Sequence, residues 1–81
     1  MSLPRLRFFT KPDCELCEHA LEVVESVRRR VAFELEQIDI TADPDLFQRY
    51  RYRIPVIEID GEAAFELTVR EDRLLARLRR R

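Results

Sequence analysis

The stretch FFTKPDCELCEHALEVV, residues 8–24, contains both cysteines of the 81-residue chain, Cys14 and Cys17, at the spacing CxxC. A short apolar run precedes them and is ended by Lys11-Pro12-Asp13, which indicates a buried strand followed by a turn. Beyond Cys14 the apolar residues recur at spacings of three and four, as on one face of a helix. The stretch therefore predicts a strand, a CxxC at a turn, and a helix of about sixteen residues.

The rest of the chain predicts five further elements. They are a strand over 33–40, a short helix with Asp43 as N-cap and Pro44 first, a strand over 54–59, a return strand over 63–67 after the hairpin signal Asp60-Gly61, and a helix over 69–81. The order β-α-β-α-β-β-α predicts a four-stranded mixed sheet with helices on both faces. We expect one α/β domain over residues 1–81, with the CxxC at the carboxyl end of the first strand.

The composition excludes several classes of protein. Apolar residues make up 46% of the chain and charged residues 38%, with a net charge of −1, so there is no general attraction to nucleic acid or an anionic membrane. The N-terminus lacks the apolar run of a signal peptide, and no stretch reaches transmembrane length. Two cysteines so close together do not make a secreted disulfide framework. We expect a cytoplasmic protein that binds neither nucleic acid nor a membrane.

The positions of the two cysteines predict different roles in disulfide exchange. Cys14 lies at the start of the helix, where unpaired N–H groups and the positive end of the dipole favour a thiolate. Cys17 lies nearly one turn later, within disulfide reach, at the start of the buried stripe. We therefore predict that Cys14 attacks a substrate disulfide and that Cys17 resolves the mixed disulfide. Three acids beside the pair oppose thiolate formation and Lys11 favours it, which leaves the reduction potential open; the acids are Asp13, Glu15 and Glu18.

Two other readings of the CxxC remain open. A metal ion needs four ligands, or three and a water, whereas this chain offers two cysteines and His19, which the helical period turns away from them. A metal site would then require two chains or an external thiol, and no metal is expected. Alternatively the cysteines are inert and the domain is a non-catalytic binding module.

Ile54-Pro55 is the second feature that bears on function. A proline at the start of a strand lacks the ladder donor, and one use of it is a cis peptide bond that leaves the preceding backbone free. The N–H and C=O of Ile54 are then candidates to hold an extended substrate. Three arginines flank this dipeptide, Arg49, Arg51 and Arg53, and are either candidates to bind a glutathione carboxylate or an acidic partner or a solvated surface of the short helix and loop. Arg53 and Lys11 complete the predicted substrate-binding residues.

The first strand with FFTKPDCELC, the long helix and the later YRYRIPVIEIDGE together resemble the small glutaredoxin-like proteins of the thioredoxin-fold superfamily. The resemblance covers almost the whole chain. It implies a thioredoxin-like fold of the glutaredoxin type, dithiol–disulfide exchange without a cofactor, Cys14 as nucleophile, Cys17 as resolving cysteine and Pro55 as the cis-proline. The expected function is that of a thiol–disulfide oxidoreductase that reduces protein or small-molecule disulfides.

Two departures from that family bear on the reductant. Common glutaredoxins carry Pro-Tyr between the cysteines, whereas this chain has Glu15-Leu16, and the stretch 61–66 lacks their Gly-Gly pattern. The reductant is therefore open between glutathione, as a co-substrate, and a thioredoxin reductase or another dithiol protein. We expect a monomer whose partners are a disulfide substrate and this thiol reductant system.

Overall fold

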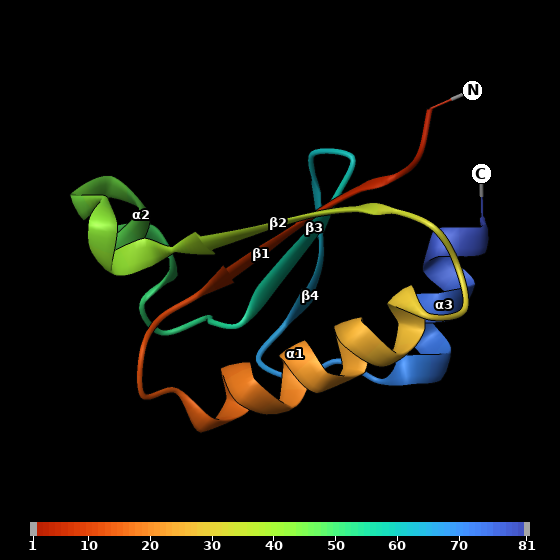
Figure 1. The fold of residues 1–81 in the computed structure, drawn as a ribbon. Coiled ribbons are helices and arrows are strands. Elements are labelled where there is room, and N and C mark those ends of the chain that lie inside the picture. Colours follow the sequence, from red (N-terminus) through yellow and green to blue (C-terminus); the bar gives the residue numbers. More distant parts are fainter. Residues whose placement is uncertain (1, 81) are drawn as a thin grey trace.

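The computed structural model describes residues 2–80. Its elements follow the predicted order β-α-β-α-β-β-α, with one additional turn of 3-10 helix (Figure 1). Arg81, the last residue of the expected C-terminal helix, lies outside the described residues. The elements are β1 (Arg5–Thr10), α1 (Glu15–Arg28), β2 (Glu34–Asp39), the 3-10 turn η1 (Ile40–Ala42), α2 (Pro44–Tyr50), β3 (Val56–Ile59), β4 (Glu62–Glu66) and α3 (Glu71–Arg79).

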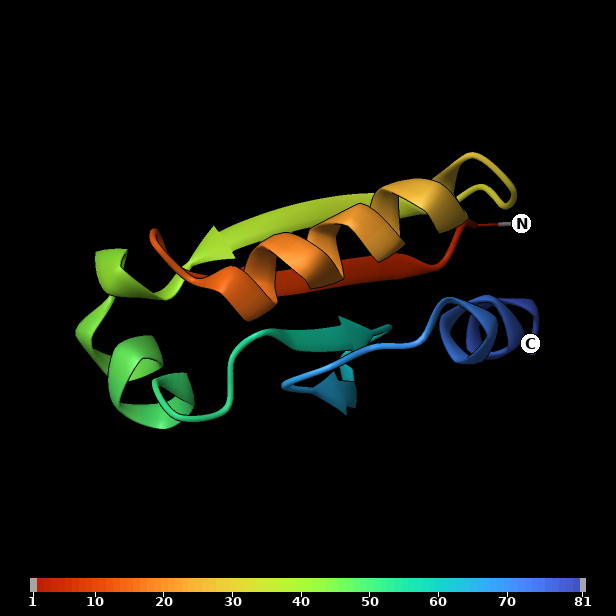
Figure 2. The same ribbon diagram turned by 90° about the horizontal axis from the view of Figure 1, so that it is seen from below.

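The four strands form one mixed sheet in the order β2-β1-β3-β4. β1 pairs in parallel with β2 and antiparallel with β3, and β3 pairs antiparallel with β4. Phe9 lies opposite Ile38 of β2 and Val56 of β3, so the end of β1 and the start of β3 lie at the same edge of the sheet. α1 therefore begins at the edge from which β3 starts (Figure 2).

The two faces of the sheet differ in how they are covered. Leu6 and Phe8 are buried on the face that α1 and α3 cover, and these two helices also contact each other. Phe9 points to the other face, where its ring lies 4.7 Å from the ring of Tyr50 in α2. The expected helices on both faces are present, but α2 covers only one end of its face.

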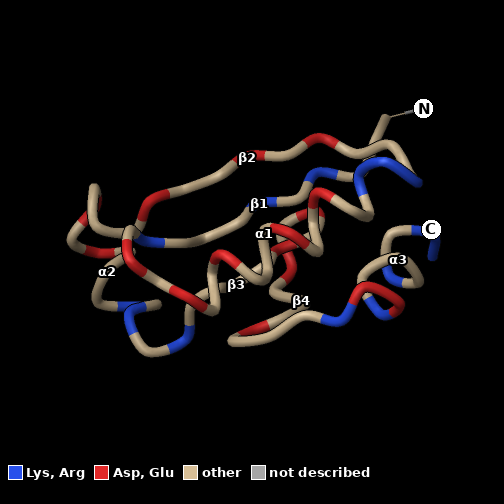
Figure 3. The backbone as a smooth tube through the Cα atoms, turned by 60° about the horizontal axis from the view of Figure 1, so that its bottom comes forward, with Lys and Arg blue, Asp and Glu red and all other residues tan. Residues whose placement is uncertain are grey.

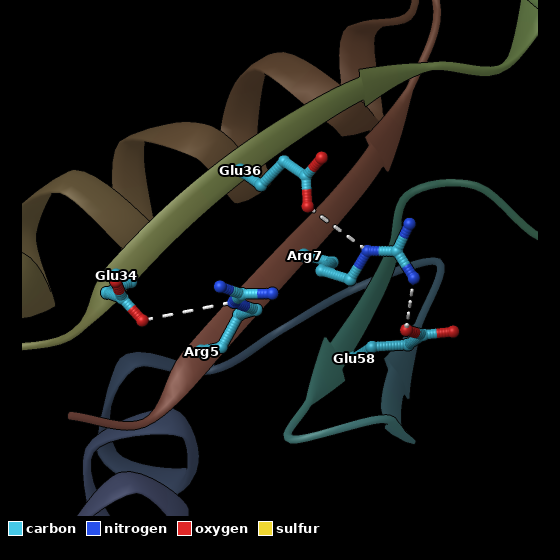
Figure 4. A network of polar contacts seen from close by, with 5 residues as sticks. All are labelled: Arg5, Arg7, Glu34, Glu36 and Glu58. Atoms are coloured by element: carbon cyan, nitrogen blue, oxygen red, sulfur yellow. Dashed lines mark hydrogen bonds and ion pairs between the residues drawn. The ribbon is translucent and has the colours of Figure 1, made fainter. Parts of the chain in front are cut away.

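The remainder of that second face carries a network of charged side chains (Figure 4). Arg7 of β1 lies between two carboxylates, 3.3 Å from Glu36 of β2 and 3.5 Å from Glu58 of β3. Arg5 and Glu34 form a longer pair of 3.9 Å. The pairs with Glu34 and Glu36 are exposed and each contribute less than about 1 kcal/mol, whereas Glu58 is only 14% exposed and its pair with Arg7 is partly buried. Together they keep this part of the face, which no helix covers, polar.

The ends of α1, β2 and β4 differ by one or two residues from the sequence-based expectation, and two element starts and one added turn differ for identifiable reasons. β3 begins at Val56 and not at Ile54, because the Ile54 N–H donates to the Tyr50 carbonyl at 3.1 Å and makes no ladder bond. The last helix begins at Glu71 and not at residue 69, after an extended Arg70. The unexpected turn η1 is capped by Asp39, whose carboxylate accepts hydrogen bonds from the Thr41 hydroxyl and N–H at 2.6 and 2.9 Å; these bonds lower the pKa of Asp39.

No helix within residues 2–80 has the length and apolar character needed to cross a bilayer.

The β3–β4 hairpin turns at Asp60 and Gly61, as the sequence predicts. Both residues have a positive φ, 51° at Asp60 and 87° at Gly61, which is the geometry of a two-residue hairpin turn that follows the twist of the strands. The Asp60 carboxylate also accepts the Arg5 N–H at 3.0 Å and so ties the turn to β1. No atom lies within 4 Å of a Cβ placed on Gly61, so the constraint at this position is conformational and not steric.

We predict that Gly61→Ala lowers the free energy of unfolding by about 1 kcal/mol, because alanine tolerates the left-handed region poorly. Gly61→Asn is the matched control, since asparagine adopts this region more readily and is expected to lose less than half as much. Urea unfolding of the three proteins measures the difference. Equal losses in the two variants would contradict the conformational explanation.

Candidate active site

Cys14 lies at the junction of β1 and α1, after a reversal of the chain at Asp13. Asp13 has a φ of 57°, in the left-handed region that aspartate adopts more readily than most residues. Cys14 itself is extended and forms the N-cap of α1, and its Sγ accepts a hydrogen bond from the N–H of Cys17 at 3.2 Å. The sulfur therefore lies among the unpaired N–H groups at the positive end of the helix.

Cys14 and Cys17 are joined by a disulfide bond, with their Cα atoms 5.2 Å apart. The two sulfurs differ in access, because Cys14 is half-buried whereas Cys17 is only 3% exposed and belongs to the hydrophobic core. An external thiol or disulfide would therefore reach the sulfur of Cys14 before that of Cys17.

The charged neighbours of the pair all lie in solvent. Lys11, Asp13, Glu15, Glu18 and His19 are exposed, and none of them forms an ion pair with a residue in the range 2–80. In the same range, no three His, Cys, Asp or Glu side chains are grouped closely enough to hold a metal ion.

Ile54 and Pro55 are buried immediately before β3, at the edge of the sheet that carries the CxxC. The peptide bond between them is cis. The N–H of Ile54 is not free for a substrate, as the sequence suggested, because it donates to the carbonyl of Tyr50. Across the described residues, no backbone N–H outside the strands and helices donates to the Ile54 carbonyl. Of the two backbone groups predicted to hold a substrate, only this carbonyl therefore lacks such a partner.

Arg53 is held by the protein itself. Its guanidinium forms a two-bond ion pair with Glu66 of β4, in which Nε donates at 3.1 Å and Nη2 donates to the same oxygen, and it lies 5.2 Å from the centre of the Tyr50 ring. The hydrogen bonds lower the pKa of Glu66 and raise the pKa of Arg53. Arg53, which the sequence predicts to bind a substrate carboxylate, is thus paired within the protein and ties the segment before Pro55 to β4, and its binding of a substrate stays a prediction.

Leu67 is a residue of this region that the sequence did not single out. Its N–H donates to the carbonyls of Pro55 and Arg53 at 2.9 and 3.3 Å, and its own φ is 67°. Its side chain is 46% exposed and, with Leu16 between the cysteines, lines a groove of about 310 Å³ beside the start of α1. A leucine at a positive φ has no sequence signal, since such residues are rare outliers.

The comparisons with known proteins agree with this geometry. The family model described as "Glutaredoxin-like domain (DUF836)" matches residues 5–79. A curated relative from Dictyostelium discoideum, named a glutaredoxin-like protein, is 35% identical over 75 residues, which cover 85% of this chain and 69% of that protein.

Solved structures show the same architecture. A structural-genomics target protein from X. campestris has a TM-score of 0.77 at 28% identity and covers 90% of this chain and 93% of its own. A protein from Nitrosomonas europaea has a TM-score of 0.81 at 24% identity, with coverages of 96% and 94%. A mutant thioredoxin from Halobacterium salinarum has a TM-score of 0.71 at 24% identity, with coverages of 95% and 73%, so the fold is that of the thioredoxins. With a family model that spans residues 5–79, the chain belongs to the glutaredoxin-like family.

Proposed function

We propose that this protein is a thiol–disulfide oxidoreductase in which Cys14 is the nucleophile and Cys17 the resolving cysteine. The observation that carries the proposal is the position of Cys14 Sγ, which is at the helix N-cap, accepts the Cys17 N–H and is bonded to Cys17. An N–H donor and the positive helix end stabilise a thiolate more than a thiol. The more accessible sulfur is therefore also the one whose surroundings favour the reactive form.

The proposed reaction starts from the reduced protein. The Cys14 thiolate attacks one sulfur of a substrate disulfide, the substrate S–S bond breaks, and the first substrate thiolate leaves and takes a proton from solvent. Cys17 then loses its proton and attacks Cys14 Sγ, which releases the second substrate thiolate. The protein ends with the Cys14–Cys17 disulfide seen in the structure, and the substrate has gained two electrons and two protons.

The second half of the cycle needs an external thiol reductant. Two thiol equivalents, from glutathione or from a dithiol protein, would reverse the same exchange steps and restore Cys14 and Cys17. We propose that no further cofactor takes part, that the protein works as a monomer, and that it acts in a reducing compartment such as the cytoplasm.

Substrate positioning is assigned to the edge of the sheet beside the CxxC. The open carbonyl of Ile54 would accept one backbone hydrogen bond from an extended substrate, and Pro55 would pack beneath it. Lys11, exposed between β1 and α1, would contribute a positive charge to the same surface. Arg53 would be a positioning residue, because its ion pair with Glu66 holds the segment before Pro55 against β4.

The assignment of roles predicts different behaviour of two serine variants. Cys17→Ser should accumulate mixed disulfides through Cys14, because the intramolecular attack that resolves them is lost. Cys14→Ser should trap none and should lose disulfide reduction in an insulin assay. Non-reducing gels and intact-mass spectrometry of proteins trapped from cell extract measure both effects.

The same variants separate an oxidoreductase from a non-catalytic binding module. A binding module would retain its partners in Cys14→Ser, and the Cys14–Cys17 pair would show no defined potential in dithiothreitol redox buffers. Mixed disulfides that form through Cys17 in place of Cys14 would contradict the assignment of roles.

The Arg53–Glu66 pair predicts a pH-dependent contribution to stability. Because the pKa of Glu66 in the folded protein is lower than its ordinary value of 4.5, the pair stabilises the fold fully above that value. This contribution is lost as the pH falls through the lowered folded value. Glu66→Gln should therefore be less stable than the unmodified protein at neutral pH, and urea unfolding should show the two curves converging in strong acid.

A matched control for this experiment is Glu62→Gln, which alters the other exposed glutamate at the opposite end of β4. Glu62 is 80% exposed and its contact with Arg77 is 3.4 Å long, so the substitution should change stability little at any pH. If the difference in unfolding free energy between Glu66→Gln and the unmodified protein stayed constant down to strong acid, the proposed contribution of the Arg53–Glu66 pair would be contradicted.

A further inference from the structure

We propose that the site selects protein disulfides whose flanking charges are of opposite sign, with an acidic segment against the arginines before β3 and a basic segment against the acids of α1. The inference rests on the proposed function and names the substrate class of the same site. It starts from two groups of charged side chains that form no ion pair within residues 2–80, on two segments at the end of the molecule that carries the CxxC (Figure 3).

The basic group is the segment RYRYR, residues 49–53. Arg53 is consumed by Glu66, whereas Arg49 and Arg51 are exposed and form no ion pair with any residue in the range 2–80. The Arg51 guanidinium lies 5.0 Å from the ring centre of Phe47 and 4.7 Å from that of Tyr52, which is itself 80% exposed. Two rings thus hold an unpaired guanidinium at the surface, and such a group is well suited to bind a carboxylate.

The acidic group runs along α1 from the first turn. Glu15, Glu18, Glu22 and Glu25 are exposed and have no ion-pair partner in the described part of the chain. Three of them line a shallow groove of about 510 Å³ together with Leu21 and Arg29; these are Glu18, Glu22 and Glu25. No ion pair within the described residues neutralises these glutamates, and Arg29 lies only at the C-terminal end of the groove, so the stripe attracts a basic chain and repels an acidic one.

The start of the acidic stripe, in the first turn of α1, and the arginine segment lie at the same end of the molecule as the CxxC, and the stripe then continues along α1 away from that end (Figure 3). Figure 3 shows acidic positions along α1 from its start and basic positions in the segment that joins α2 to β3. That segment leads directly into Ile54-Pro55, at the sheet edge where α1 begins. A disulfide that reaches Cys14 therefore has positive charge on one side of it and negative charge on the other.

This arrangement favours an extended protein segment as the occupant. The charges are carried by different elements, and the intervening apolar side chains Leu16 and Leu67 are 45% and 46% exposed. A ligand that meets both charge groups must span this surface, as a polypeptide on either side of a cysteine does. A uniformly acidic segment would be attracted by Arg51 but repelled by the glutamates of α1. A uniformly basic segment would be attracted by those glutamates but repelled by Arg51.

The test uses the full-length reduced protein in single-turnover reactions with synthetic peptides. Each peptide carries one cysteine as a mixed disulfide with 2-mercaptoethanol, flanked by four residues on each side: acidic then basic, basic then acidic, all acidic, all basic, or all neutral. At low salt, one of the two mixed-charge peptides should be reduced about tenfold faster than the uniformly charged ones, and 0.5 M salt should remove most of the difference.

Two charge variants locate the effect and a third controls for it. Arg51→Glu should reduce the preferred mixed-charge peptide several-fold more slowly, and Glu22→Lys, farther along the same acidic stripe, should accelerate the all-acidic peptide. Arg73→Glu makes the same charge change on an exposed arginine of α3, at the other end of the molecule, and should leave the ranking unchanged (Figure 1). Neither Arg51 nor Glu22 adjoins the reacting dithiol in the chain, so the neutral peptide should be reduced at the same rate by all variants.

Rates that differ by less than twofold among the charged peptides would overturn the inference while leaving the proposed function intact. A ranking that Arg51→Glu and Arg73→Glu alter equally would overturn it as well, because the effect would then follow net charge and not the site. Failure to reduce any peptide, the neutral one included, would instead refute the oxidoreductase activity on which the inference rests.

Discussion

β1 hydrogen-bonds to a strand on each side, and the position of the candidate site follows from that constraint. Its six residues pair in parallel with β2, and the four residues 6–9 also pair antiparallel with β3, so β1 is held from both sides almost to its end. The three residues that follow β1 lead directly to Cys14, and the start of β3 brings Ile54-Pro55 to the same edge. Segments about forty residues apart in sequence therefore meet because of backbone pairing alone, before any side chain of the site is considered.

A second layer of contacts holds the segment before β3 in place. The Tyr50 carbonyl accepts the Ile54 N–H, and the Leu67 N–H bonds to carbonyls of Arg53 and Pro55. The ring of Tyr50 stacks on Phe9, one residue from the end of β1. These bonds use most of the polar backbone groups around Pro55, which leaves few for an incoming chain. The segment before β3 is thus held mainly by bonds within the protein, and among the described residues the Ile54 carbonyl accepts no backbone N–H from outside the strands and helices.

The sequence was a good guide wherever local chemistry decides the structure. The apolar period identified α1, Asp43 and Pro44 marked the start of α2, and Asp60-Gly61 located the hairpin. It was a poor guide to long-range pairing of polar groups. Nothing near Arg53 indicates that Glu66 will meet it, since that contact depends on the register between β3 and β4, including its irregularity after Ile57. The same holds for the Ile54 N–H, whose partner is set by how α2 ends.

The charged network on the helix-free face has a consequence for how the chain reaches its register. Arg7 meets Glu36 and Glu58 only when both neighbouring strands are aligned as they are here. A slip of β2 by one residue would bring Leu35 or Gln37 opposite Arg7 and turn a glutamate toward the core. A slip of β3 would do the same with Glu58 and place an isoleucine in water. Each misalignment thus carries both an electrostatic and a solvation penalty. Arg7, Glu36 and Glu58 therefore help to specify the register of the three strands.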